Sequence, residues 1–299
     1  MNPITVIKVG GASLEDLATG PLVLDAIAAL SRVGPVVLVH GGGRAVDRQL
    51  ARLNMPTQRH NGLRITPADQ VEQIVGVLSG TENARIVGDL LARDCRAMGM
   101  CLGDGNAVPT RKLTRPEVDL GLVGELDFDV SSNPSNPTSA SKPAPRDLLA
   151  HSPNVLRLLC EAGFVPVVCS IGIEILPIAS MGSSGSRSRT LNINADDAAL
   201  GVVRSLVNDG CKVAALVLLT DVAGVLDAHK VLVPELDRAG IDALVAVNVA
   251  SGGMLVKVNA AHETAKVLGI PVVIASGVDP VSLSALAQGT PRGTRIVPQ

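Results

Sequence analysis

Short runs of aliphatic residues recur along the chain and alternate with stretches in which apolar residues repeat at helical spacing. The runs predict buried strands at Ile4–Val9, Pro35–Val39, Met98–Leu102, Val165–Cys169, Val213–Leu219 and Pro271–Ala275. The helical stretches predict helices at Leu14–Leu30, Arg44–Leu53, Asn194–Val207 and Gly253–Leu268. Strands that are apolar on both faces need helices on both sides. The predicted fold class is therefore α/β, with an open, mostly parallel sheet sandwiched by helices.

The signals between these elements are more local. Thr66-Pro67 is typical of a helix start, with Thr66 as the capping residue, and the helical stretch that follows is interrupted near Gly80. Residues 131–145 are rich in Ser, Asn and Pro, and residues 180–189 are rich in Gly and Ser, so both are expected to be surface loops. Ligands of such sheets bind beyond the carboxyl ends of the strands, which makes the residues after each strand the candidates for chemistry.

Composition and charge remove several classes of function. Trp and Tyr are absent, so a bound adenine ring would lie between aliphatic side chains. A net charge of −2 gives no reason to expect nucleic acid or an anionic membrane as a partner. No apolar stretch of the sequence is long enough to span a bilayer, and the N-terminus does not resemble a signal peptide. The cysteines form no C-x-x-C pair and the histidines lack metal-ligand spacing, so we expect a cytoplasmic protein without a metal site of its own.

Two glycine clusters follow the first two predicted strands. Lys8-Val9-Gly10-Gly11 ends the first strand, and His40-Gly41-Gly42-Gly43 leads from the second strand into a helix. Glycine lets backbone N–H groups approach a ligand closely, and a helix N-terminus attracts an anion. Either cluster alone is as often a tightly packed turn, but together they predict one cradle for phosphate groups. The P-loop, dinucleotide-binding and protein-kinase fingerprints are absent.

Further candidates lie downstream, and each has a structural alternative. Arg64 could bind an anion or be a surface charge. Asn194 could bind substrate or only cap a helix, and Asp196 could act in catalysis or complement the helix dipole. Lys257 could reach the site or extend along the apolar surface of a half-buried helix.

Several segments of the chain follow one another in the order that is typical of one family. They are IKVGG (7–11), VHGGG (39–43), NGLRITPADQ (61–70), LGDGNAV (102–108), NINADDAA (192–199), LLTDVAGVLD (218–227), SGGMLVKVNAA (251–261) and GTRI (293–296). In these segments the chain resembles the acetylglutamate kinases, a branch of the amino-acid kinase family. The resemblance implies that ATP phosphorylates the side-chain carboxylate of N-acetyl-L-glutamate, in arginine biosynthesis, with Mg²⁺ bound through the nucleotide phosphates.

The resemblance also implies a role for each site residue. Lys8 and Lys257 would hold the transferring phosphoryl group, and Asp196 would orient both lysines. The acid substrate would be held by Gly42, Gly43, Arg64, Asn192 and Asn194, with the α-carboxylate on the arginine. The nucleotide would be bound by Gly10, Gly11, Thr220, Asp221, Val222, Ala223, Gly224, Val225, Val249, Ala250 and Ser251. Residues 1–208 would form an N-terminal lobe for acid binding and dimerisation, and residues 209–299 a C-terminal lobe for nucleotide binding.

The residue types suit this chemistry. A carboxylate with a pKa near ~4 is ionised at neutral pH, so it needs no general base and no catalytic histidine. The obstacle is the repulsion between this anion and the γ-phosphate. Two lysines, glycine N–H groups and Mg²⁺ would offset the repulsion, and an aspartate between the lysines would keep both protonated. Arg64 suits a carboxylate because the planar guanidinium can bind both oxygens.

The chain also departs from the family pattern. Residues 127–152 and 175–189 look longer than the corresponding family segments, which leaves the specificity for the acid open. Arginine-inhibited members carry an extra N-terminal helix for hexamer assembly, whereas the first strand here starts near Ile4, so we expect an arginine-insensitive homodimer. Two alternatives stay open: a kinase for a related small acid, such as a carrier-bound aminoadipate or a carbamate, and a nucleotide or amino-acid sensor without catalysis.

Overall fold

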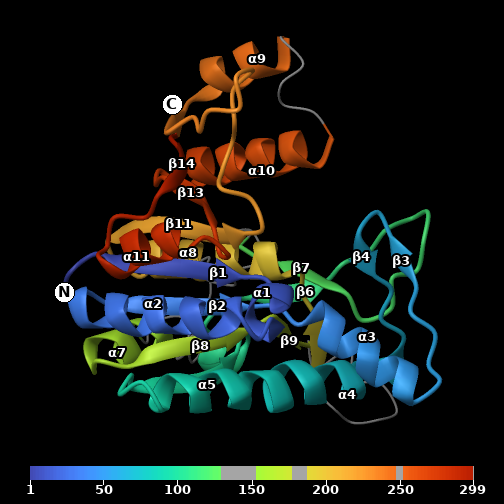
Figure 1. Ribbon diagram of the computed structural model, residues 1–299. Coiled ribbons are helices and arrows are strands. Elements are labelled where there is room, and N and C mark those ends of the chain that lie inside the picture. Colours follow the sequence, from blue (N-terminus) through green and yellow to red (C-terminus); the bar gives the residue numbers. More distant parts are fainter. Residues whose placement is uncertain (129–152, 177–186, 247–251, 299) are drawn as a thin grey trace, which may run out of the picture.

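The computed structural model describes residues 1–128, 153–176, 187–246 and 252–298, and the side chains of residues 246–257 lie outside the described part. Its centre is an eight-stranded sheet. The strand order is β12 (Glu235–Leu236), β14 (Gly293–Ile296), β13 (Val272–Ser276), β11 (Val213–Thr220), β1 (Ile4–Val9), β2 (Val36–His40), β8 (Val165–Cys169) and β5 (Ala97–Cys101). From β14 to β8, the labels follow this order down Figure 1. Strands β13 and β14 pair antiparallel and all other neighbours in the sheet pair parallel, so β14 and β12 run against the rest.

Helices cover both faces of this sheet. One face packs against α2 (Thr19–Val33), α5 (Asn83–Leu91) and α11 (Pro280–Ala287). The other face packs against α7 (Val155–Glu161), α8 (Ala195–Asn208), α9 (Arg238–Ala246) and α10 (Gly252–Leu268). Side chains alternate along β1, because Ile4 and Val6 belong to the core under α8 while Ile7 and Val9 belong to the core under α2. By this alternation Lys8 lies on the α8 face.

Shorter elements gather at the carboxyl ends of the central strands. They are α1 (Gly11–Glu15), α3 (Gly43–Arg52) and three hairpins: β3 (Arg59–His60) with β4 (Leu63–Arg64), β6 (Thr110–Lys112) with β7 (Gly124–Leu126), and β9 (Ile171–Ile175) with β10 (Ser188–Asn192). The β3–β4 hairpin projects at the right of Figure 1, beyond α3. Its turn is Asn61-Gly62, and both residues have positive φ, at 48° and 83°. This pair is the strongest short signal for a tight hairpin, and it is present in the sequence.

The predicted fold class is confirmed, and each predicted strand is found to within about one residue at its ends. One predicted helix is wrong: Leu14–Leu30 is divided between α1 and α2. The cause is Asp16, whose Oδ1 accepts hydrogen bonds from the N–H groups of Ala18 and Thr19 at 3.0 and 2.8 Å. A carboxylate that binds these N–H groups starts a new helix, so periodicity alone missed the break.

The helix after Thr66 also differs from its prediction. It begins at α4 (Ala68–Val75), and the capping position is Pro67 and not Thr66. The Thr66 hydroxyl instead donates to the Arg64 carbonyl oxygen at 3.1 Å. The interruption near Gly80 is a π-helical segment, Gly76–Glu82, so the chain stays helical into α5.

Of the two predicted loops, only the last residues of the second belong to the described part of the chain. Residues 131–145 lie outside the described part. Of residues 180–189, the last two already belong to β10, where Arg189 pairs with Glu174 of β9 at 2.5 Å, so the prediction of a loop is wrong at that end. None of the helices in the described residues is both long and apolar enough to cross a membrane.

Candidate active site

The two glycine clusters meet at the carboxyl ends of β1 and β2. A Cβ atom added to Gly11 would lie 2.8 Å from the Cα atom of Gly42 and 3.3 Å from the carbonyl oxygen of Gly41. A Cβ atom does not approach a backbone carbon as closely as 2.8 Å, so the two turns can lie this close only because residue 11 is glycine. Around Gly10 and Gly43, by contrast, an added Cβ would have no heavy atom within 4 Å. The contact and the open space beside it form a backbone surface at the start of α1 and α3.

Helix α8 brings a third N-terminus to this surface. A Cβ added to Gly41 would lie 3.2 Å from the Cβ of Ala195, the first residue of α8. The helix starts there because the Asn194 side chain accepts hydrogen bonds from the N–H groups of Asp196 and Asp197 at 2.8 and 3.4 Å. This capping contact uses the side-chain oxygen of Asn194, so a ligand contact from this residue would have to come from its amide nitrogen.

Lys8 and Asp196 form an ion pair at the same place. The Lys8 Nζ lies 2.8 Å from Asp196 Oδ1, and the side chains are 16% and 64% exposed. The aspartate thus faces solvent while the lysine reaches it from the sheet. A largely buried ammonium held beside glycine N–H groups is suited to neutralising the charge of a bound phosphate.

Arg64 lies on the α3 side of the glycine turns. Its side chain is buried, with 7% exposed, so it is not the surface charge that was one alternative. The Nη2 group donates to the Gly43 carbonyl oxygen at 3.1 Å, and Nη1 lies 2.7 Å from Asp47 Oδ1 on α3. Burial alone would raise the pKa of Asp47, but the guanidinium groups of Arg64 and Arg59 lower it below its ordinary value. Arg64 is thus a buried cation, fixed next to Gly43 by a carboxylate.

Asn192 joins the site through Thr66. Its side-chain Nδ2 donates to the Thr66 hydroxyl oxygen at 3.0 Å, and that hydroxyl donates to the Arg64 carbonyl oxygen. Asn192 ends β10, two residues before the cap of α8. Thr66 thereby links Asn192 of one hairpin to Arg64 of another through two hydrogen bonds.

The segment TDVAGV, residues 220–225, begins beside the first glycine cluster. Leu219 of β11 pairs with Val9 of β1, so Thr220 follows at the same sheet edge as Gly10. Asp221 and Ala223 are exposed, but the side chain of Val225 is buried in the core. Val225 could therefore contact a nucleotide only through its backbone.

A buried threonine holds this segment in place. The Thr294 hydroxyl accepts a hydrogen bond from the Val225 N–H and donates to the Val233 carbonyl oxygen, each at 2.7 Å. Gly224 has φ of +142°, and a Cβ there would lie 2.7 Å from the Thr294 Oγ1. This position therefore requires glycine for packing.

The other predicted site residues have side chains outside the described part of the chain. Lys257 lies on α10, but its side chain is outside the described part, and so are residues Val249, Ala250 and Ser251. Among the described residues no group of three His, Cys, Asp or Glu side chains is arranged to hold a metal ion.

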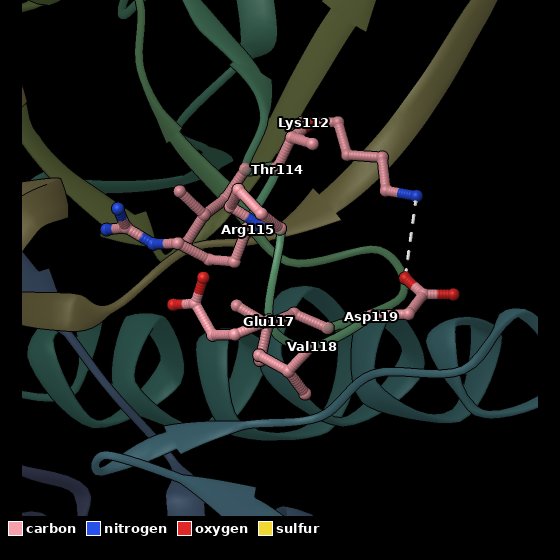
Figure 2. Close-up of a pocket in the computed structure, with 9 residues that line it drawn as sticks. Lys112, Thr114, Arg115, Glu117, Val118 and Asp119 are labelled. Carbon is pink, nitrogen blue, oxygen red and sulfur yellow. Dashed lines mark ion pairs between the residues drawn. The ribbon is translucent and has the colours of Figure 1, made fainter.

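A hollow of about 430 Å³ is formed without any residue of the glycine turns. It is lined by residues 112–120, the loop between β6 and β7, and it contains none of the predicted site residues. Figure 2 shows Lys112 and Asp119 facing each other across it, 3.8 Å apart. The end of this loop is held to a residue close to Arg64 in the sequence, because the Thr66 N–H donates to the Leu120 carbonyl oxygen at 3.0 Å. We place the chemistry at the glycine turns, because residues from several strands and helices meet there, whereas one loop lines this hollow.

Sequence reasoning missed two residues of this site. Asp47 follows Gly43 by one helical turn, and that spacing was the available signal for a partner of a cation at the turn. Thr294 lies in the segment GTRI, where no local pattern reveals that it meets residues 225 and 233.

Comparison with known sequences identifies the family. Residues 3–276 match the sequence model of the amino acid kinase family. The chain belongs to this family. It is 35% identical to the acetylglutamate kinase of Pectobacterium atrosepticum in an alignment of 299 positions that covers 99% of this chain and 100% of that one. The resemblance found in the sequence motifs is thereby confirmed, and the chain is a kinase of the amino acid kinase family.

Solved structures of similar fold include two that span the chain. N-acetylglutamate synthase from Neisseria gonorrhoeae, complexed with coenzyme A and N-acetyl-glutamate, has a TM-score of 0.71 and 21% identity, covering 99% of this chain and 60% of that one. The protein smu.665 from Streptococcus mutans UA159 has a TM-score of 0.67 and 23% identity, with both chains covered completely. At these identities the likeness concerns the fold.

Proposed function

We propose that this chain transfers the γ-phosphoryl group of ATP to the side-chain carboxylate of N-acetyl-L-glutamate, which forms N-acetylglutamyl 5-phosphate for arginine biosynthesis. The observation that carries the reaction type is the ion pair of Lys8 and Asp196 beside two touching glycine turns. The choice of acid rests on the full-length similarity to an acetylglutamate kinase.

The reaction needs charge neutralisation and positioning. A carboxylate oxygen of the acid forms a bond to the γ-phosphorus, and the bond from that phosphorus to the β–γ bridging oxygen breaks, with ADP as the leaving group. No proton has to move, because the carboxylate is already ionised near pH 7. The protein therefore has to hold two anions close together, and fixed cations and N–H groups can do so.

The phosphoryl group would lie at the glycine turns. Lys8 would contact it from β1, with its ammonium held by Asp196, and Gly10 and Gly11 would offer N–H groups from the start of α1. Lys257 would be the second ammonium. Mg²⁺ would enter with the nucleotide phosphates, and it would help to neutralise them.

The acid would lie on the α3 side of the turns. Arg64 is already fixed to Gly43 and Asp47, and these contacts use Nη1 and one proton of Nη2. The edge of the guanidinium that carries Nε and Nη2 would receive the two oxygens of the α-carboxylate. Gly42, Gly43, Asn192 and Asn194 would complete the acid site.

The nucleotide would lie over the half of the sheet that residues 209–299 build. In this division residues 1–208 bind the acid. The exposed part of residues 220–225 would line the nucleotide, and residues 249–251 would lie opposite. We further propose a cytoplasmic homodimer whose activity does not respond to arginine, and an initial rate that falls at millimolar arginine would contradict the last point.

The test is to trap the acyl phosphate. The enzyme is incubated with ATP, Mg²⁺, hydroxylamine and one acid at a time: N-acetylglutamate, glutamate, an aminoadipate derivative or a carbamate. The expected result is a hydroxamate with N-acetylglutamate at a rate well above the others. A hydroxamate formed only with another acid identifies a related kinase. If the protein binds nucleotide but forms neither ADP nor a hydroxamate with any acid, it is a sensor.

A further inference from the structure

A buried histidine lies directly beneath the glycine turns. His40 is the last residue of β2, and its side chain has no exposed surface. By the alternation along β2, His40 lies on the same face as Val36 and Leu38, which pack under α2 and α5. The proposed reaction does not use His40 as an acid or a base, so its place needs another explanation.

Both ring nitrogens of His40 are engaged. Nδ1 lies 3.0 Å from the carbonyl oxygen of Gly41, and Nε2 lies 3.0 Å from the Nδ2 of Asn83. The same Asn83 Nδ2 also lies 2.9 Å from the carbonyl oxygen of Val167, which identifies it as the amide nitrogen and a donor. Nε2 must therefore accept, and Nδ1 carries the proton and donates to Gly41. Burial is the main reason that the pKa of His40 is lowered to about 4, so the ring is neutral near pH 7.

This hydrogen bond fixes a peptide plane. In a trans peptide the carbonyl and the following N–H point in opposite directions, so a held Gly41 carbonyl also sets the direction of the Gly42 N–H. Since the Gly41 carbonyl faces the imidazole ring, the Gly42 N–H points away from that ring. The plane is also confined by contact with Gly11 and by Leu78 of the π-helical segment, because a Cβ on Gly42 would lie 2.6 Å from the Leu78 Cδ2.

We propose that His40 is a positioning residue: its neutral ring holds the Gly41–Gly42 peptide so that the Gly42 N–H faces the reacting anions. The inference rests on the proposed function, in which Gly42 binds the substrate. His40 acts through the backbone and touches no ligand. Asn83, at the end of the π-helical segment, keeps the ring in the tautomer that donates to Gly41.

Three variants separate this role from simple core packing. His40→Asn places an amide N–H near the position of Nδ1, so it can still donate to Gly41. His40→Gln extends to the position of Nε2 and keeps the contact with Asn83 but not the donor to Gly41. His40→Leu keeps neither. Leu156→Ala is the control, because Leu156 is fully buried in the core on the opposite face of the sheet and is not one of the proposed site residues.

The measurement is kcat and KM for each folded variant, beside its midpoint of thermal unfolding. We expect kcat to fall about 10- to 100-fold in His40→Gln and His40→Leu, and to stay within about 3-fold in His40→Asn, since a misdirected N–H donor loses transition-state stabilisation. The control should lose stability while its kcat stays within about 3-fold. If kcat instead follows the unfolding midpoint across all four variants, or if Asn and Gln are equivalent, His40 only fills the core.

A readout without turnover keeps this test independent of the substrate. The amide resonance of Gly42 in ¹⁵N-labelled protein reports the orientation and hydrogen bonding of that peptide. It should move in His40→Gln and stay close to its wild-type position in His40→Asn. If the wild-type enzyme phosphorylates no acid, the proposed function is wrong while this result still decides the inference. Equal shifts in both variants would overturn the inference alone.

Discussion

Replacement of Gly11 by alanine tests whether the two glycine turns form one cradle. The new methyl group would lie 2.8 Å from the Gly42 Cα, and an ordinary contact begins at 3.4 Å, so backbone must move by about 0.6 Å because a packed interior cannot absorb the overlap. Overpacking of this kind costs about 1–3 kcal/mol, and up to ~1 kcal/mol is regained because alanine favours the helix α1. The free energy of unfolding should fall by about 1–2 kcal/mol.

The effect on catalysis should exceed what this loss of stability explains. A displacement near 1 Å at a reacting centre can cost about 100-fold in rate, so we expect kcat to fall by about 10-fold or more. The assay is hydroxamate formation at saturating substrates, with urea unfolding followed in parallel. Gly34→Ala is the matched control, since Gly34 lies between α2 and β2 with extended backbone and open space around an added Cβ.

The control should keep wild-type kcat and stability. If Gly11→Ala behaves like Gly34→Ala in both measurements, the two turns are not packed against each other and the cradle described above is wrong. If it loses stability but keeps kcat, the turns touch but do not hold the reacting groups.

Three further predictions follow from named contacts. Lys8→Met should lower kcat by about 100- to 1,000-fold but change the free energy of unfolding by less than about 1 kcal/mol, because Asp196 is 64% exposed and can be hydrated. Steady-state kinetics and urea unfolding measure the two effects, and a large loss of stability with little change in kcat would show that the ion pair is structural. Arg64→Lys should raise the KM for the acid about 10-fold or more and leave the KM for ATP nearly unchanged, because lysine lacks the paired N–H donors of a guanidinium. A change in the KM for ATP alone would assign Arg64 to the nucleotide half of the site. The pKa of His40 is lowered to about 4, mainly by burial and in part by nearby Arg85, so the unfolded chain binds this proton at higher pH than the folded chain. The free energy of unfolding should therefore fall by roughly 3 kcal/mol as the pH falls from about 6.5 to about 4. In urea titrations at each pH, His40→Asn should lack this component, and pH profiles identical to those of the wild type would contradict the assignment.

The central sheet was predictable because its strands are apolar on both faces. Runs such as Val165–Cys169 leave few alternatives to a strand covered by helices on both sides, and the structure places that run in β8. Breaks that depend on one side chain were not predictable from periodicity. Asp16 divides a helix through two hydrogen bonds, and Thr66 turns from the expected cap to the Arg64 carbonyl.

The site divides in the same way. The touching glycine turns follow from the rule that ligand loops meet at the carboxyl ends of parallel strands, and the sequence shows which strands carry glycine. Partners across long sequence separations do not follow from any local rule. Examples are Asn83 for His40 and Thr294 for Val225, each of which depends on how helices and strands pack.

The claim on which the account rests is that the transferring phosphate lies between the glycine turns and Lys8. A crystal structure with a non-hydrolysable ATP analogue, Mg²⁺ and N-acetylglutamate tests it most directly. The account predicts γ-phosphate oxygens within hydrogen-bonding distance of the Lys8 Nζ and of the N–H groups of the two turns, with the Lys257 side chain on the same phosphate. A γ-phosphate bound elsewhere, or the two lysines pointing into different clefts, would contradict it.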